Sequence, residues 1–103
     1  MPKSLPLEKQ IRQFIQAEVR KLGGKAWLLV ENNRRGFPDL TILHPLIRHA
    51  IFVELKRSEL QHTTPQQTYV IQELKNLGQD VYVVKGTEQA REFIEMFKSL
   101  LKK

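Results

Sequence analysis

The stretch that decides the fold is residues 51–57, which read IFVELKR. It begins with three apolar residues, as a buried strand does, and then places Glu54 and Lys56 on either side of Leu55. Because side chains alternate between the two faces of a strand, the two charged groups point the same way, roughly 7 Å apart, and the apolar ones share the other face. Two charges on an otherwise apolar strand call for an explanation.

Length and composition bound the class of protein. The chain has 103 residues, 41% of them hydrophobic, which is enough for one compact domain with a buried core. We therefore expect residues 1–103 to form a single domain. There is no cysteine, so disulfides and thiolate metal sites are excluded. No apolar run approaches the ~20 residues that span a membrane, and the N-terminus lacks the apolar middle of a signal peptide, so we expect a cytoplasmic protein.

The charge balance favours a polyanionic partner. The chain carries 17 Lys and Arg against 11 Asp and Glu, a formal net charge of +6. Such a surplus on a small domain favours nucleic acid as the partner. A solvated surface with excess lysine is the alternative, and composition alone gives nucleic acid only a modest advantage.

Hydrophobic periodicity predicts seven elements in the order αβββαβα. Helices are expected at about 7–22, 65–77 and 88–101, and strands at 25–31, 39–43, 50–56 and 80–85. The chain is expected to turn at 44–49, between the second and third strands. Three consecutive strands can form a meander, and a helix-linked fourth strand then joins by a right-handed crossover. We therefore predict an α/β fold with a central four-stranded mixed sheet flanked by helices.

Apolar residues at these spacings mark the expected core. Trp27 and Tyr82 fall in strand patterns, so we expect them in the core rather than at a surface where they would stack on bases. The inner stripe of the second helix is expected to comprise Val70, Ile71, Leu74 and Leu77. The last helix has a similar stripe, which includes Phe93, Ile94 and Phe97.

Asp39 is a further polar residue in an apolar context. It follows Pro38 at the start of the second strand, so pairing of the second and third strands would place it beside Glu54. Two adjacent carboxylates resist joint ionisation unless a cation lies between them, and oxygen ligands suit Mg²⁺. The metal would activate water, and Lys56 would orient or deprotonate that water or neutralise charge on a phosphate. The pattern therefore predicts hydrolysis of a phosphodiester.

A surface ion pair is the alternative explanation of Glu54 and Lys56. For E-x-K alone this alternative is favoured, because such pairs are common on solvated faces. A Pro-Asp pair followed by E-x-K on the adjacent strand is much less common. The combination therefore favours a site.

Gln67 and Glu8 are also polar residues near apolar stripes. Gln67 lies on the inner stripe of the second helix, where it needs a hydrogen-bonding partner such as the carboxylates or their waters. Thr64 to Gln67 also match a capping box with Pro65 at the first helical position, which explains Gln67 about equally well. One side chain cannot easily serve both purposes. Glu8 lies in the first turn of the first helix, where an acid usually interacts with the helix dipole.

Three arginines are candidate contacts to nucleic-acid phosphates. Arg34 and Arg35 lie in a loop just before Asp39, where paired guanidinium groups would grip phosphates. Two solvated loop charges are an equally good explanation. Arg57 follows Lys56 directly and is the third candidate. No pair of histidines has the i, i+4 spacing of a helical zinc motif, so we do not expect a histidine metal site.

Five segments together resemble a known family. In chain order they are LEKQIRQFI, GFPDLTIL, AIFVELK, a glutamine ahead of the apolar stripe of the second helix, and LGQDVYVV. In order and spacing they resemble the VRR-NUC family of the PD-(D/E)xK nuclease superfamily, and in particular its small stand-alone members from phages and bacteria. The resemblance covers about residues 7–86 and implies a restriction-endonuclease-like core, followed by the C-terminal helix.

The resemblance assigns roles to four residues of the expected site. It implies that Asp39 and Glu54 bind the metal through their carboxylates. The backbone carbonyl of Leu55 would be a further ligand. Lys56 would be the catalytic lysine.

The resemblance also shifts the interpretation of two other residues. Glu8 matches the acid of the first helix that helps to hold a metal or its water, and Gln67 matches the glutamine of the following motif. Both therefore become site candidates. The turn at 44–49 departs from the family pattern, because it is longer and more apolar than the glycine-rich hairpin of many members. We interpret its Leu46 and Ile47 as a candidate dimer contact.

Members of this family use Mg²⁺ or Mn²⁺ to cut DNA, and the stand-alone forms are similar to Holliday-junction resolvases that act as homodimers. The resemblance therefore implies a homodimeric, metal-dependent DNA endonuclease acting on branched DNA, in the cytoplasm of a bacterium or a phage-infected host cell. The alternatives are a flap or restriction-like nuclease on the same core, a DNA-binding module that does not cut, and a partner-binding protein with solvated charges. The presence of Asp39, Glu54 and Lys56 together argues against the non-cutting module.

Overall fold

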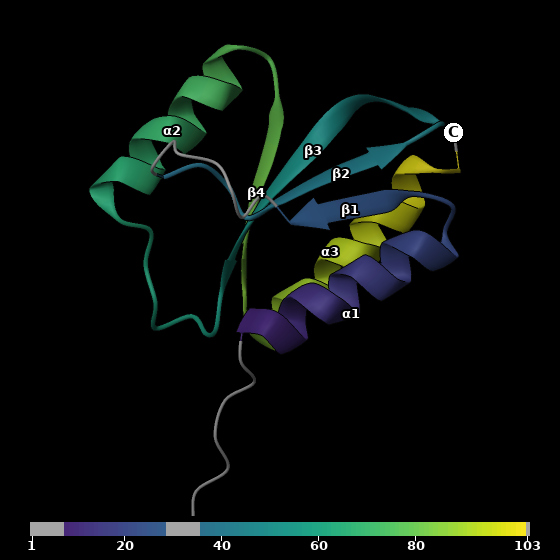
Figure 1. Cartoon of the computed structure of the whole chain (residues 1–103), viewed down its shortest axis with the longest axis horizontal. Helices are drawn as coiled ribbons and strands as arrows, with labels where there is room; N and C mark the ends of the chain where they lie inside the picture. Colours follow the sequence, from purple (N-terminus) through teal and green to yellow (C-terminus); the bar gives the residue numbers. More distant parts are fainter. Residues whose placement is uncertain (1–7, 29–35, 103) are drawn as a thin grey trace, which may run out of the picture.

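The computed structural model describes residues 8–28 and 36–102 and shows seven elements in those ranges (Figure 1). In chain order they are α1 (Glu8–Lys21), β1 (Lys25–Leu28), β2 (Leu40–His44), β3 (Ile47–Lys56), α2 (Pro65–Asn76), β4 (Asp80–Lys85) and α3 (Gly86–Leu100). The order αβββαβα confirms the sequence-based prediction. Within the described ranges no helix combines the length and the apolar character that crossing a membrane requires.

The described strands form one mixed sheet in the order β1-β2-β3-β4. β1 with β2, and β2 with β3, pair antiparallel, so the first three strands form the predicted meander. β4 follows α2 in the chain and pairs in parallel with β3. This topology confirms the predicted α/β fold and leaves β1 and β4 at the edges of the sheet (Figure 1).

The hairpin between β2 and β3 is shorter than the turn predicted at 44–49. His44 pairs with Ile47, so only Pro45 and Leu46 make the turn, and β3 begins three residues earlier than predicted. The expectation of a long apolar turn was therefore wrong. Of the two residues interpreted as a dimer contact, Leu46 is exposed, whereas Ile47 packs against the core.

The ring of His44 explains why this short turn is stable. Its Nδ1 accepts a hydrogen bond from the N–H of Leu46 at 3.0 Å, and its Nε2 lies 2.7 Å from the carbonyl oxygen of Leu22. Because a carbonyl can only accept, Nε2 donates to Leu22 while Nδ1 accepts from Leu46. The ring also packs edge-on against Phe97. Sequence patterns predicted a loop here because they do not show these tertiary contacts.

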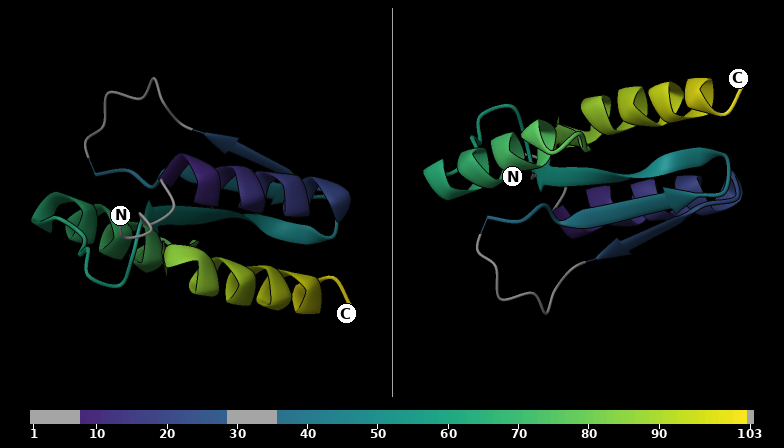
Figure 2. Two further views of the ribbon diagram at one scale, coloured as in Figure 1. Left: turned by 90° about the horizontal axis from the view of Figure 1, so that it is seen from below. Right: turned by 90° about the horizontal axis from the view of Figure 1, so that it is seen from above.

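The core lies between one face of the sheet and the paired helices α1 and α3, which contact each other. α2 lies apart from both, as the views in Figures 1 and 2 show. β3 contributes Ile51, Val53 and Leu55 to the core, and its alternate residues Glu54 and Lys56 point to the opposite face. The other members of the core are Ile11, Ile15, Val19, Ala26, Leu40, Ile42, Val84, Ala90, Phe93, Ile94 and Phe97.

Two residues predicted for the core lie on the surface. Trp27 is 55% exposed, because it lies on the edge strand β1 and points away from the core face to which Ala26 contributes. Leu77 is 74% exposed, because it follows the last residue of α2 and caps it. Tyr82 is confirmed as a core-packed residue, and its ring meets that of Phe93 at 5.5 Å.

Candidate active site

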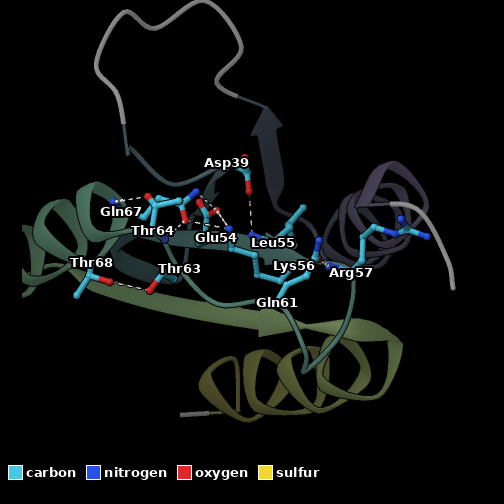
Figure 3. A network of polar contacts seen from close by, with 10 residues as sticks. All are labelled: Asp39, Glu54, Leu55, Lys56, Arg57, Gln61, Thr63, Thr64, Gln67 and Thr68. Atoms are coloured by element: carbon cyan, nitrogen blue, oxygen red, sulfur yellow. Dashed lines mark hydrogen bonds and ion pairs between the residues drawn. The ribbon is translucent and has the colours of Figure 1, made fainter.

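β2 and β3 bring Asp39 and Glu54 to adjacent positions, as strand pairing predicted (Figure 3). Leu40 pairs with Val53 in the antiparallel register, so the next position along both strands sets Asp39 opposite Glu54. Residues opposite each other point to the same face of the sheet. Asp39 Oδ2 accepts a hydrogen bond from the backbone N–H of Leu55 at 2.8 Å, which holds this carboxylate at the start of β2.

Glu54 is a buried carboxylate with one oxygen engaged and one left over. Its side chain is only 2% exposed, and Oε2 accepts a hydrogen bond from Gln67 Nε2 at 2.7 Å. Oε1 is buried and makes no hydrogen bond with any described residue. Burial, followed by the negative charge of Asp39, raises the pKa of Glu54 from its ordinary value of 4.5 to about 7, while Lys56 opposes the shift. A carboxylate in this condition is favourably placed to accept a cation.

Lys56 is the positive charge of the site. Its Nζ lies 3.5 Å from Glu54 Oε2 and donates a hydrogen bond to Gln67 Oε1 at 2.9 Å. The residue is buried, unlike the solvated pair considered from the sequence. The arrangement therefore contradicts a surface ion pair and keeps the ammonium group in a fixed position beside the carboxylates.

Gln67 caps α2 and contacts the charged pair at the same time (Figure 3). Its Oε1 accepts hydrogen bonds from the backbone N–H of Thr64 and from Lys56 Nζ, both at 2.9 Å, and its Nε2 donates to Glu54. Its own backbone N–H donates to Thr64 Oγ1 at 3.1 Å and completes the capping box. The prediction that one side chain cannot easily serve both purposes was therefore wrong, because a carbonyl oxygen has two lone pairs.

These partners also fix the orientation of the Gln67 amide. The Gln67 amide has three partners. Lys56 Nζ and the backbone N–H of Thr64 are donors, and the third partner is a carboxylate oxygen of Glu54. The reverse orientation would set Nε2 against the two donors and Oε1 against the carboxylate. Only the observed orientation satisfies all three contacts.

Comparison with known proteins places this chain in a family. The family model for the VRR-NUC domain matches residues 3–88, which is most of the sequence. The chain belongs to the VRR-NUC family. A curated relative, "Putative nuclease p44" of Acyrthosiphon pisum secondary endosymbiont phage 1, is 38% identical over 77 residues, which cover 75% of this chain and 81% of that protein. The family resemblance inferred from the sequence is therefore confirmed.

Solved structures of VRR-NUC domains share this fold. One, described as "VRR_NUC domain", has a TM-score of 0.77 at 28% identity and covers 85% of this chain and 94% of that chain. A second, described as "VRR_NUC domain protein", has a TM-score of 0.77 at 18% identity and covers 94% of this chain and 92% of that chain. Both agree with the observed order of helices and strands.

In this VRR-NUC chain, Gly36 lies in the segment just before Asp39 and packs against the backbone of the first turn of α2. Its φ is +83°, and a Cβ placed on it would come within 2.6 Å of the carbonyl oxygen of Gln66. The absence of a side chain on this glycine therefore permits both the turn and the close approach of two backbones. Pro38 is fully buried, and the ring of Phe37 packs edge-on against Phe52 at 5.6 Å. Asp39 is therefore positioned from α2 as well as from β3.

The remaining predicted site residues are Glu8, Arg34, Arg35 and Arg57. Glu8 is exposed in the first turn of α1, and residues 8–28 and 36–102 contain no group of three His, Asp or Glu side chains suited to a metal ion. Arg34 and Arg35 lie outside the described residues. Arg57 follows β3, and its backbone N–H donates to Gln61 Oε1. The roles predicted for these residues stay predictions.

Proposed function

We propose that this chain is a metal-dependent DNA endonuclease that hydrolyses phosphodiester bonds. The observation that carries the proposal is the buried Glu54, whose Oε1 lacks a hydrogen-bond partner among the described residues and whose neighbour Asp39 is a second carboxylate. Membership of the VRR-NUC family and the name of the phage relative support nuclease activity. Oxygen donors of this kind suit Mg²⁺ or Mn²⁺.

The residues present fit such an ion. Asp39 and Glu54 would hold it through their carboxylates, Leu55 through its backbone carbonyl, and Glu8 directly or through water. The mutual repulsion that helps to raise the pKa of Glu54 is the repulsion that a cation relieves. When bound, the ion supplies a Lewis acid that lowers the pKa of water and screens developing negative charge.

The residues of the chain would prepare the reaction around this ion. The hydrogen bond from Gln67 to Glu54 Oε2 fixes the carboxylate and leaves Oε1 as its available oxygen. The contact of Lys56 with Gln67 keeps the ammonium group within 3.5 Å of the same carboxylate. From there Lys56 would orient the attacking water or neutralise charge on the phosphate oxygens.

The proposed substrate is branched DNA, and the proposed active form is a homodimer. Two copies of the site would make paired cuts across a four-way junction. Arg34, Arg35 and Arg57 would contact phosphates, and the net charge of +6 supports binding to the DNA backbone whatever its sequence. Affinity should therefore fall steeply as salt increases.

A cleavage panel tests the proposal. Purified protein freed of metal is given Mg²⁺ or Mn²⁺ with a four-way junction, a flap and a linear duplex, and its mass in solution is measured alongside. We expect cutting only with metal and best on the junction, loss of cutting in Glu54→Gln, and normal cutting in Glu95→Gln, which alters an exposed ion pair on α3. Preference for the flap or for the linear duplex would replace the branched-DNA proposal with one of those nuclease types, and no metal-dependent cutting of any substrate would overturn the nuclease proposal.

A further inference from the structure

Trp27 is the only tryptophan of the chain, and more than half of its surface is exposed. It lies on β1, which has a neighbour on one side only among the strands that the structure describes. A tryptophan on the surface of a monomer places a large apolar ring in water, and aromatic rings are enriched where proteins bind partners. The exposed ring of Trp27 therefore marks a candidate binding surface.

The surroundings of Trp27 are basic and polar. Together with α1, β1 borders an open hollow of about 440 Å³, lined by Gln13, Gln16, Arg20, Lys25, Ala26 and Trp27. Among the described residues, the lining contains two cations and no acid. Neither Arg20 nor Lys25 forms an ion pair within residues 8–28 and 36–102. The hollow therefore offers an aromatic face beside unpaired positive charge, which suits a single-stranded nucleic acid better than an acidic or apolar protein.

Trp27 also lies on the same face of the sheet as the candidate catalytic carboxylates. It pairs with Thr41, which is two residues from Asp39, and side chains two residues apart on a strand share a face. Trp27 is therefore separated from Asp39 by roughly 7 Å along the strand direction and by roughly 5 Å across one strand spacing. Glu54 lies one strand further. A strand of DNA held at Glu54 would thus reach Trp27 within a few nucleotides.

We propose that the hollow beside β1 binds an unpaired stretch of nucleic acid, with a base stacked on Trp27 and its phosphates against Arg20 and Lys25. It rests on the proposed function only in naming DNA as the ligand. Such a site would favour substrates with unpaired nucleotides next to the scissile bond, because a base inside a duplex has no free face. It would thus give the enzyme a way to recognise branch points.

Fluorescence of the single tryptophan tests the proposal without any cleavage. In EDTA, a single-stranded oligothymidylate should quench Trp27, whereas a blunt duplex and an abasic strand with the same phosphates should not. The abasic strand separates stacking from charge attraction. The Glu95→Gln variant should show the same quenching, because it alters only an exposed ion pair on α3.

The affinity of each variant for a labelled single strand is measured by fluorescence anisotropy. Trp27→Leu should weaken binding about tenfold, and Trp27→Phe, which keeps a ring, by less. Arg20→Gln and Lys25→Gln should each reduce the slope of log K against log salt by about 0.7. Tyr69→Leu is the matched control, because Tyr69 is 63% exposed but lies on α2, away from the hollow.

Two outcomes would overturn this proposal. One is binding of the oligothymidylate that does not involve Trp27, seen either as binding without quenching of its fluorescence or as unchanged affinity for Trp27→Leu. The other is a Trp27→Leu variant that changes the mass of the protein in solution but not its affinity for single strands, which would make Trp27 part of a contact between copies. Quenching without any cleavage activity would instead support the single-strand site while removing the nuclease proposal.

Discussion

Leu55 and Glu54 are neighbours on β3, each is 2% exposed, and they point to opposite faces of the sheet. Leu55 contacts other apolar residues, and such burial stabilises the fold by about 2 kcal/mol. Glu54 contacts an amide, an ammonium group and a second carboxylate, and its raised pKa shows that burying its charge is unfavourable. One face of β3 thus stabilises the fold, whereas the other face holds a buried charge that is unfavourable for stability. This combination is expected of a functional site.

The largest expected effect separates these two faces. Glu54→Gln keeps the size of the side chain and removes its charge, so we expect cleavage to fall about a thousandfold, the loss of several kcal/mol of charge stabilisation. Its free energy of unfolding should stay the same or rise. Leu55→Ala should instead lower the free energy of unfolding by about 3 kcal/mol. Cleavage rates and urea denaturation of both variants check this, and an unstable Glu54→Gln would contradict it.

The pH dependence of stability should show the buried charge directly. Between pH 4.5 and about 7 the unfolded chain releases the Glu54 proton while the folded chain keeps it, so this group makes stability fall as the pH rises through that window. The expected loss is about 3 kcal/mol, complete above pH 7. The difference in unfolding free energy between the parent and Glu54→Gln, measured in EDTA from pH 4 to 8, isolates this contribution. A difference that does not change with pH would count against the buried charge.

Gly36 and Gly78 allow the link between the Asp39 segment and α2 to be tested with a matched control. Both have φ +83°, but a Cβ on Gly78 meets nothing within 4 Å, whereas one on Gly36 meets the backbone of Gln66. Gly78→Ala should cost about 1 kcal/mol, for the backbone conformation alone. Gly36→Ala should cost about 3 kcal/mol and reduce cleavage, because the segment that carries Asp39 must move. Equal effects of the two changes would mean that the contact with Gln66 is unimportant.

The two halves of the capping box should separate the stability of α2 from the function of the site. Gln67→Glu keeps the oxygens that cap the helix but sets a negative charge against Glu54, so cleavage should fall about 10- to 100-fold. Repulsion between the two carboxylates should also lower stability. Thr64→Ala removes the hydroxyl that accepts from the Gln67 N–H and should cost about 1 kcal/mol with little change in cleavage. The same pattern of loss in both variants would show that Gln67 acts only through the helix.

Sequence reasoning predicted the fold and the carboxylate pair because both follow from local rules. The period of apolar residues gave the order of the helices and strands, and the pairing of consecutive strands placed Asp39 beside Glu54. Pattern and resemblance together marked Gln67. Each of these inferences needed only neighbours along the chain or across one hairpin.

What could not be predicted depends on contacts between distant segments. A strand pattern does not tell an edge strand from a central one, so Trp27 was placed in the core. The imidazole contact that closes the hairpin joins His44 to Leu22, and no spacing rule shows it. The second role of Gln67 requires Lys56 and the start of α2 to meet in space. The missed features therefore depend on which segments of the chain meet in space and which do not.

The central claim is that the carboxylates at the ends of β2 and β3 hold a divalent cation. An anomalous difference map from crystals grown with Mn²⁺ measures this most directly. We predict a peak bound by Asp39 and by Oε1 of Glu54, with Lys56 beside it. A map without a peak at these two carboxylates, from protein that cuts DNA in the same Mn²⁺ buffer, would contradict the claim.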